Sequence, residues 1–357
     1  MDVLISFAST LVEQMQKPTL AFLIVGMMLA ALGSKFEIPE PVYKFVVILL
    51  LLKVGMGAGI SIRSANFAEL IVPAIGAMAV GIAIVFLGSS LLSRLGGVSP
   101  MDGYATAGLF GAVSASTLAA GMAMLDDAGM FYEGFIGALY PFMDIAALVT
   151  AIVLAKMAAS RKAASATLQP GGTVTLGGGT GATPNMGENI GENMGLFRSI
   201  LTDTLKSAAI SALLAGLALG LLARPDSVYE SFYEPLFRGL LSILMIIMGM
   251  EAWARLSEMR KVAHVYILYG VTAPFLHGAL GFGAGMIAHE LTGFSAGGVV
   301  LLSVMAASSS DISGPPTIRA ALPEANSSAY IGSSTGLGTP VAILSIPLWI
   351  TLAEMFI

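Results

Sequence analysis

The sequence lacks cysteine and has little charge. Without cysteine, neither disulfide bonds nor thiolate metal sites can form, and the redox compartment stays open. Charged residues make up 11% of the 357 residues, whereas soluble domains carry about a quarter. The net charge of −5 argues against a nucleic-acid partner, and Asp2, with no basic stretch before the first apolar run, argues against a cleaved signal peptide. Hydrophobic residues make up 56% of the chain, and this high share indicates a membrane protein.

Apolar runs that can cross a membrane recur along the chain, since a spanning helix needs about 20 such residues. We predict ten spans, at 18–34, 41–61, 68–93, 102–125, 134–158, 199–223, 234–253, 262–290, 297–322 and 327–355. Residues 159–198 are glycine-rich and have too little apolar surface to fold alone. The prediction is an all-α polytopic membrane protein with five helices in 1–158, a flexible linker at 159–198, and five helices in 199–357.

The two halves carry similar motifs in the same order. Met56–Gly57 recurs as Met248–Gly249, Ser114 in GAVSAST as Ser308 in AASSSDIS, and GALYP as GLGTP. The separation between matched motifs grows slowly along the chain, as expected for two copies that differ by small insertions. Because five is odd, the second copy crosses the membrane upside down. This inverted repeat is the plan of many secondary transporters.

Lysine and arginine are unevenly divided between the two sides of the predicted topology. The side that holds both termini has four, namely Lys17, Arg63, Arg224 and Arg238. The opposite side has twelve, namely Lys35, Lys44, Arg94, Lys156, Arg161, Lys162, Arg198, Lys206, Arg255, Arg260, Lys261 and Arg319. The positive-inside rule therefore places the linker 159–198 in the cytoplasm and both termini outside. Lys53 lies within a span, where it could be a structural counter-ion.

The fourth and ninth spans contain helix-breaking residues at matching positions, Gly111–Thr117 and Ser308–Pro316. Interrupted helices survive in a membrane only where protein or water surrounds the break, and a matching pair is typical of a transport site. Inversion makes the N-termini of the two restarted helices converge near the midplane, where free N–H groups and hydroxyls bind anions. Pro315 and Pro316 suit the first turn of the restarted helix, with Ser313 as its N-cap.

Asp311 lies in the second interruption. Carboxylates inside a membrane are costly and usually functional, and one beside an anion site needs a cation. We therefore predict that a hard monovalent cation travels with a small anion. Asp144, in the fifth span, could serve the same site or pair with a neighbouring helix. Ser114 and Ser116, taken alone, could also be small residues that let helices pack closely.

Four stretches, AASSSDISGPPTIRA, GLFGAVSAST, ALYPFMDI and LFRGLLSILMIIMGMEAW, closely resemble the cyanobacterial sodium-dependent bicarbonate transporter family. The similarity covers essentially the whole chain outside the linker. It implies sodium-coupled import of bicarbonate across the plasma membrane, as part of a CO2-concentrating mechanism. It also implies a homotrimer in which a core domain moves past a scaffold (gate) domain, in elevator-like alternating access. A cytoplasmic PII-like regulator that senses nucleotides is the implied protein partner.

The resemblance also implies residue roles. Sodium would be co-transported and held by Asp311 with Ser310. No organic cofactor is implied. Bicarbonate would contact residues of both interruptions, namely Ser114, Ser116, Thr117, Ser308, Ser309, Ser313 and Gly314. Two departures are visible: Ala115 stands where the family is expected to have glycine, and the linker lacks the longer, charged sequence of relatives. The second departure puts linker-mediated regulation in doubt.

Other functions stay open from the residues alone. Symport of another small anion, such as a carboxylate, is disfavoured because the predicted pocket has no arginine, which larger carboxylates often recruit as a clamp. A passive channel would leave Asp311 without a use, and a sensor would bind the anion without moving it. A serine hydrolase would need a base beside its nucleophile, and neither interrupted segment contains histidine. We therefore do not expect an enzyme.

Overall fold

The computed structural model describes residues 17–65, 67–95, 97–167, 204–259 and 264–357, together with 195, 198, 201 and 202. Within these residues all regular elements are helices. Seven helical stretches of the described chain are long and apolar enough to cross a membrane, and three further apolar helices are shorter. The protein is therefore an all-α, multi-pass membrane protein, as predicted.

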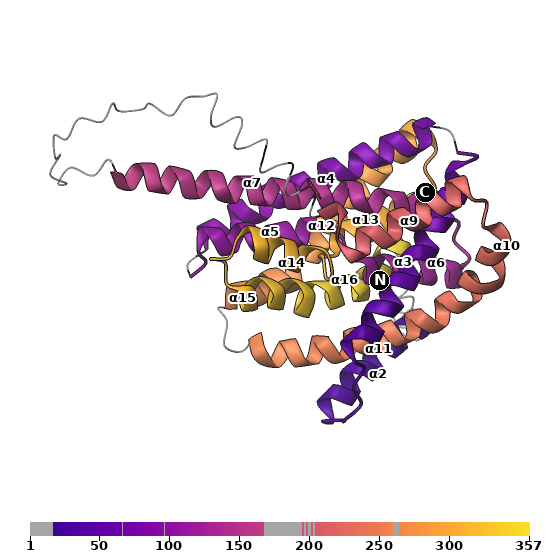
Figure 1. Cartoon of the computed structure of the whole chain (residues 1–357), viewed down its shortest axis with the longest axis horizontal. Coiled ribbons are helices and arrows are strands. Elements are labelled where there is room, and N and C mark those ends of the chain that lie inside the picture. Colours follow the sequence, from indigo (N-terminus) through magenta and orange to yellow (C-terminus); the bar gives the residue numbers. More distant parts are fainter. Residues whose placement is uncertain are drawn as a thin grey trace.

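The helices of the first half follow the predicted spans closely. They are α2 (Pro18–Ala31), α3 (Glu40–Ile62), α4 (Phe67–Arg94), α5 (Pro100–Gly111), α6 (Ala115–Ala128), the 3-10 helix η1 (Gly134–Ala138) and α7 (Leu139–Thr167). Helix α7 continues past the predicted end at 158 and projects beyond its neighbours (Figure 1). The first residues of the predicted linker therefore belong to α7, whereas 168–194, 196 and 197 lie outside the described residues.

The second half repeats this order with small additions. Its elements are α9 (Ala208–Leu222), α10 (Asp226–Val228), the π-helix η2 (Tyr229–Tyr233), α11 (Glu234–Met259), α12 (His264–Thr292), α13 (Ala296–Ala307), α14 (Gly314–Ala321), α15 (Ser327–Ile331), the π-helix η3 (Gly332–Gly338) and α16 (Thr339–Phe356). The span predicted from residue 199 continues as α9 only from Ala208, because the Ser207 hydroxyl accepts from the amide of Ile210 (3.4 Å) and caps a new helix.

Helices α2, α3, α9 and α11 pack through glycines, with α2 against α11 and α3 against α9. A Cβ atom on Gly249 of α11 would overlap the carbonyl oxygen of Leu23 in α2. A Cβ atom on Gly216 of α9 would likewise overlap the carbonyl oxygen of Leu52 in α3. Small residues let membrane helices approach to backbone contact, and here any larger residue would push the helices apart. We call these four helices the glycine-packed group; α2 crosses α11 at one edge of the molecule (Figure 1).

We call the other helices the crossing group, because they include both interrupted helices. They are α4–α7 with η1, and α12–α16 with η3. Within this group α4 packs against α5, α7 and α12, and α12 packs against α13. Hydrogen bonds between the halves hold the starts of α5 and α13: Glu133 accepts from the amide of Ser295, the N-cap of α13 (2.7 Å), and Asp102 of α5 accepts from the amide of Asn326 (2.7 Å). Each interrupted helix is thus held at its start by a contact with the opposite half.

Candidate anion and cation site

The first interruption separates α5 from α6. The backbone is extended at Ala112 and at Ser114. The Ser114 hydroxyl then accepts from the amide of Thr117 (3.1 Å) and caps the new helix. The interruption predicted across Gly111–Thr117 is therefore present but shorter, since Gly111 still belongs to α5 and Ala115 already begins α6.

The second interruption runs from Ser308 to Ser313, between α13 and α14. Pro315 and Pro316 lie in the first turn of α14, where a missing N–H leaves no bond unmade. Ser313 occupies the N-cap position as predicted, but its side chain makes no capping bond. The Ser310 hydroxyl instead accepts from the amide of Gly314 (2.8 Å) and so does the capping.

The two interruptions, Ala112–Ser114 and Ser308–Ser313, contact each other directly, and we call this place of contact the crossing. The amide of Ser114 donates to the Ser308 hydroxyl (3.0 Å), and the amide of Ser310 donates to the carbonyl of Leu109 (2.8 Å). Backbone groups that the broken helices cannot satisfy internally are thereby satisfied by the other break, as an apolar environment requires. Ser114 and Ser308 are the pair that the sequence motifs matched between the halves.

The side chain of Asp311, from the second interruption, contacts the start of α6. Its Oδ2 atom accepts from the Ser114 hydroxyl (3.0 Å) and, at a shorter distance, from the Ser116 hydroxyl. Its Oδ1 atom is buried and has no hydrogen-bond partner in the described structure, and the same holds for the Thr117 hydroxyl. A buried carboxylate oxygen without a donor is strongly unfavourable. The unsatisfied Oδ1 atom therefore favours a bound cation.

Asp144 of α7 is fully buried and contacts both interruptions. Its two oxygens accept from the amide of Val113 (3.1 Å) and from the Ser313 hydroxyl (3.0 Å). Ser310, predicted beside Asp311 as a cation ligand, bonds to Ser313 (3.0 Å) in this cluster and makes no hydrogen bond with Asp311. Asp144 therefore contacts both interrupted segments, and this contact is compatible with either of the two roles that the sequence left open.

Two further residues reach the second interruption and were not predicted. The Thr339 hydroxyl lies 3.0 Å from the Ser309 hydroxyl, and the Tyr140 hydroxyl lies 3.4 Å from that of Ser313. Each precedes a proline in the matched motifs GALYP and GLGTP. That match is the signal that could have identified them, because both residues lie in a motif that the two halves share.

The charges of the site suit a monovalent cation together with a small anion. The salt bridges of the described residues involve neither Asp311 nor Asp144. No group of three or more acidic or histidine residues that could hold a metal occurs in the described chain. Hydroxyl groups surround both carboxylates, and hydroxyls can donate to an anion or accept a cation. This chemistry fits a hard cation beside a small oxyanion.

Comparison with known proteins identifies one family. A family model described as the Na+-dependent bicarbonate transporter superfamily matches residues 18–354. The matched range begins at the first residue of α2 and ends within α16, so it contains both interruptions and both helical groups. No curated protein matches the chain.

Proposed function

Since the chain belongs to the Na+-dependent bicarbonate transporter superfamily, we propose that it imports bicarbonate by sodium-coupled symport at the crossing of its two interrupted helices. The family is one of transporters, so the protein is not an enzyme. Bicarbonate and sodium are the two ions that the family description names, and both fit the hydroxyl and carboxylate chemistry of the crossing. Sodium is cargo here rather than a resident cofactor.

The observation that carries the proposal is the position of Asp311. Its Oδ1 atom lacks a partner, while Ser114 and Ser116 donate to its Oδ2 atom. Two like unit charges 4 Å apart repel by about 4 kcal/mol at an effective dielectric of about 20. Bicarbonate therefore binds beside Asp311 only when sodium has neutralised the carboxylate. Sodium bound to Asp311 also competes for Oδ2 and frees the two serine hydroxyls to donate to the anion.

The remaining contacts of bicarbonate are proposed from both interruptions. Thr117 supports this role most directly, because its buried hydroxyl has no hydrogen-bond partner in the described structure. Asp144 positions Ser313 rather than binding the cargo itself. Ser310 stays a predicted sodium ligand, although its hydroxyl caps α14 here. The proposed anion contacts are Ser114, Ser116, Thr117, Ser308, Ser309, Ser313 and Gly314.

We propose that residues 1–158 and 199–357 are inverted five-helix repeats. The pairing of α2 with α11 and of α3 with α9 supports this, because a two-fold relation between the halves exchanges these pairs. The glycine-packed group would be the scaffold, since its backbone contacts leave little freedom to slide. The crossing group would be the core that carries both ions in an elevator-like movement. A homotrimer and a cytoplasmic PII-like regulator rest on the family resemblance, as does a role in a CO2-concentrating mechanism.

The proposed orientation puts both termini outside the plasma membrane. Three of the four lysine and arginine side chains predicted on the side of the termini form contacts at one face. Arg238 pairs with Asp127 (2.9 Å), the Lys17 ammonium donates to the carbonyl of Asp127 (3.2 Å), and Arg63 pairs with Asp226 (2.7 Å). The end of α6 lies at the same face, so we propose that this face is extracellular.

Uptake of radiolabelled bicarbonate into sealed proteoliposomes tests the function. We expect accumulation with an inward sodium gradient and none when potassium replaces sodium. Uptake indifferent to sodium would instead indicate a passive channel. Competition with formate and acetate separates the bicarbonate proposal from symport of carboxylates, because a carboxylate transporter would be inhibited by them at concentrations near that of bicarbonate.

A further inference from the structure

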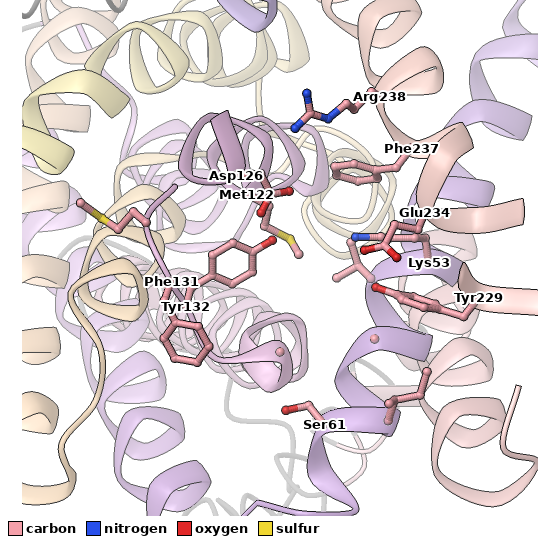
Figure 2. A pocket seen from close by; sticks show the side chains of 15 residues that line it. Lys53, Ser61, Met122, Asp126, Phe131, Tyr132, Tyr229, Glu234, Phe237 and Arg238 are labelled. Carbon is pink, nitrogen blue, oxygen red and sulfur yellow. The ribbon is translucent and has the colours of Figure 1, made fainter. Parts of the chain in front are cut away.

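A second polar region lies away from the crossing. It is a cavity of about 540 Å³ between α3, α6, residues 130–134 and the segment η2–α11. Figure 2 shows Lys53, Tyr229, Glu234 and Phe237 on one side of this space, and Asp126 with Tyr132 and Phe131 on the other. The first side belongs to the glycine-packed group and the segment before α11, the second to the crossing group. We call this space the Lys53 cavity.

Lys53 is the least expected group in this cavity. Its residue is 6% exposed, and its ammonium lies 4.4 Å from the ring centre of Phe237 and 5.6 Å from that of Tyr229. The described structure gives Lys53 no hydrogen bond and no ion pair. Ring contacts offset only part of the penalty for burying an ammonium, and lysines inside a membrane usually serve a pathway. Lys53 therefore offers its donors to a ligand in the cavity.

Negative groups share the cavity with Lys53. Asp126 and Glu234 both line it, and neither lies within ion-pair distance of Lys53. Burial and the nearby Asp126 carboxylate raise the pKa of the Tyr132 hydroxyl, which therefore stays protonated. Arg238, also in the lining, is held by Asp127 (2.9 Å). The cavity thus presents an ammonium on one wall and carboxylates on both walls, so it favours neither sign of ion outright.

The cavity and the crossing are joined by a single helix. The first turn of α6 carries Ser116 at the crossing, and the same helix brings Met122 and Asp126 to the cavity. Met122 comes six positions after Ser116 on this helix, a rise of about 9 Å. Leu118 follows Ser116 on this helix, is buried and does not belong to the lining of the cavity. The cavity is therefore a separate site one short step from the crossing.

We propose that the Lys53 cavity is an entry site where Lys53 binds the small anion before it reaches the crossing. This inference rests on the proposed function, because it assigns the anion as cargo of the same protein. A symporter must admit an anion and a cation from one side, and walls of both signs let each find a partner. The volume exceeds that of a single small anion, so bicarbonate enters with several waters, each occupying about 30 Å³.

Kinetics of two matched lysine variants test the proposal. For Lys53→Gln we expect KM for bicarbonate to rise about tenfold, the loss of one charge-assisted contact, with maximal rate and sodium half-saturation little changed. Lys44→Gln is the control: Lys44 belongs to the same helix, and its exposed side chain pairs with Glu40 (2.7 Å) outside the cavity. The KM of Lys44→Gln for bicarbonate should equal that of the protein without substitutions. An unchanged KM in Lys53→Gln would overturn the proposal.

Charge restoration separates binding from packing. The chain has no cysteine, so Lys53→Cys provides a unique site for thiol reagents. Attaching an aminoethyl group should return KM towards the original value, whereas a sulfonatoethyl group should raise it further. A purely structural lysine would give lower thermal stability in Lys53→Cys and the same KM with either reagent, and that result would refute an anion site.

A protection experiment keeps this inference distinct from the function of the crossing. In the double variant Ser61→Cys with Asp311→Asn, which keeps Lys53 and places the cysteine in the lining of the cavity, we expect bicarbonate to slow modification of the cysteine even though transport has stopped. Protection there would support the entry site whether or not the crossing assignment holds. Absence of protection at saturating bicarbonate would overturn the entry site, even if the unmodified protein shows sodium-driven uptake.

Discussion

The crossing of the interrupted helices and the Lys53 cavity both place polar groups among apolar membrane helices, but they are built in opposite ways. At the crossing, serine hydroxyls and broken backbone satisfy one another, and among the described residues of the two interruptions and the first turn of α6 only Asp311 Oδ1 and the Thr117 hydroxyl are buried without a partner. In the Lys53 cavity the helices α3 and α6 are continuous, and full charges on side chains face open space.

This difference separates two tasks. A compact site that is nearly saturated with hydrogen bonds admits few ligands, because each ligand must replace bonds already made. An open cavity with charges of both signs binds weakly and releases easily, since water competes for every contact. Under the proposed function, selectivity and coupling would belong to the crossing, and access would belong to the cavity. The predicted effects of substitutions should follow that division.

The largest effect is expected at the crossing, for Asp311→Asn. Removing the charge should lower sodium-driven bicarbonate uptake about a hundredfold or more, equivalent to about 3 kcal/mol. Uptake in proteoliposomes measures it, with Asp226→Asn as the control, because that carboxylate lies at the surface and pairs with Arg63. Folding should persist, as judged by monodisperse elution in detergent. Normal sodium-driven uptake by a well-folded Asp311→Asn protein would remove the crossing from the mechanism.

A smaller effect at the crossing is expected for Asp144→Asn. The amide can still accept from Val113, but it loses the acceptor that holds Ser313, and lost hydrogen bonds of this kind cost about 1–3 kcal/mol. Thermal stability in detergent should fall, and uptake should drop several-fold with the sodium half-saturation unchanged. A shift in sodium half-saturation as large as that caused at Asp311 would make Asp144 a cation ligand instead.

The smallest effect is expected at the rim of the Lys53 cavity, for Arg238→Gln. Its ion pair with Asp127 joins the two helical groups, but 65% of the arginine side chain is exposed, and exposed pairs contribute about 0–1 kcal/mol. Uptake should change by less than a factor of about five, the upper end of that range. A loss comparable with that of Asp311→Asn would show that this ion pair controls the movement between the groups.

Much of the fold followed from local pattern. Hydropathy located the helices, and serine, glycine and proline located both interruptions, because each of these signals acts within a few residues. The matched motifs also anticipated that Ser114 and Ser308 occupy related positions, and the two residues touch in the structure. The end of α7 was missed because residues 159–167 are less apolar but continue a helix that has already formed.

Side-chain partners at the two polar regions could not be derived in the same way. The family resemblance predicts Ser310 as a sodium ligand beside Asp311, and the structure adds that its hydroxyl contacts Ser313 and the amide of Gly314. For Lys53 the sequence leaves the role open, and the structure places its ammonium against the rings of Tyr229 and Phe237 from the other half of the chain. Both outcomes depend on how distant helices pack, and a linear pattern does not encode that packing.

Sodium entry driven by bicarbonate tests the central claim most directly. Proteoliposomes would be given an inward bicarbonate gradient and equal sodium on both sides, and entry of radioactive sodium would be followed for the unmodified protein and for Asp311→Asn. We predict that bicarbonate drives sodium inward through the unmodified protein and that Asp311→Asn abolishes this movement. Bicarbonate entry without accompanying sodium in the unmodified protein would contradict coupling at the crossing.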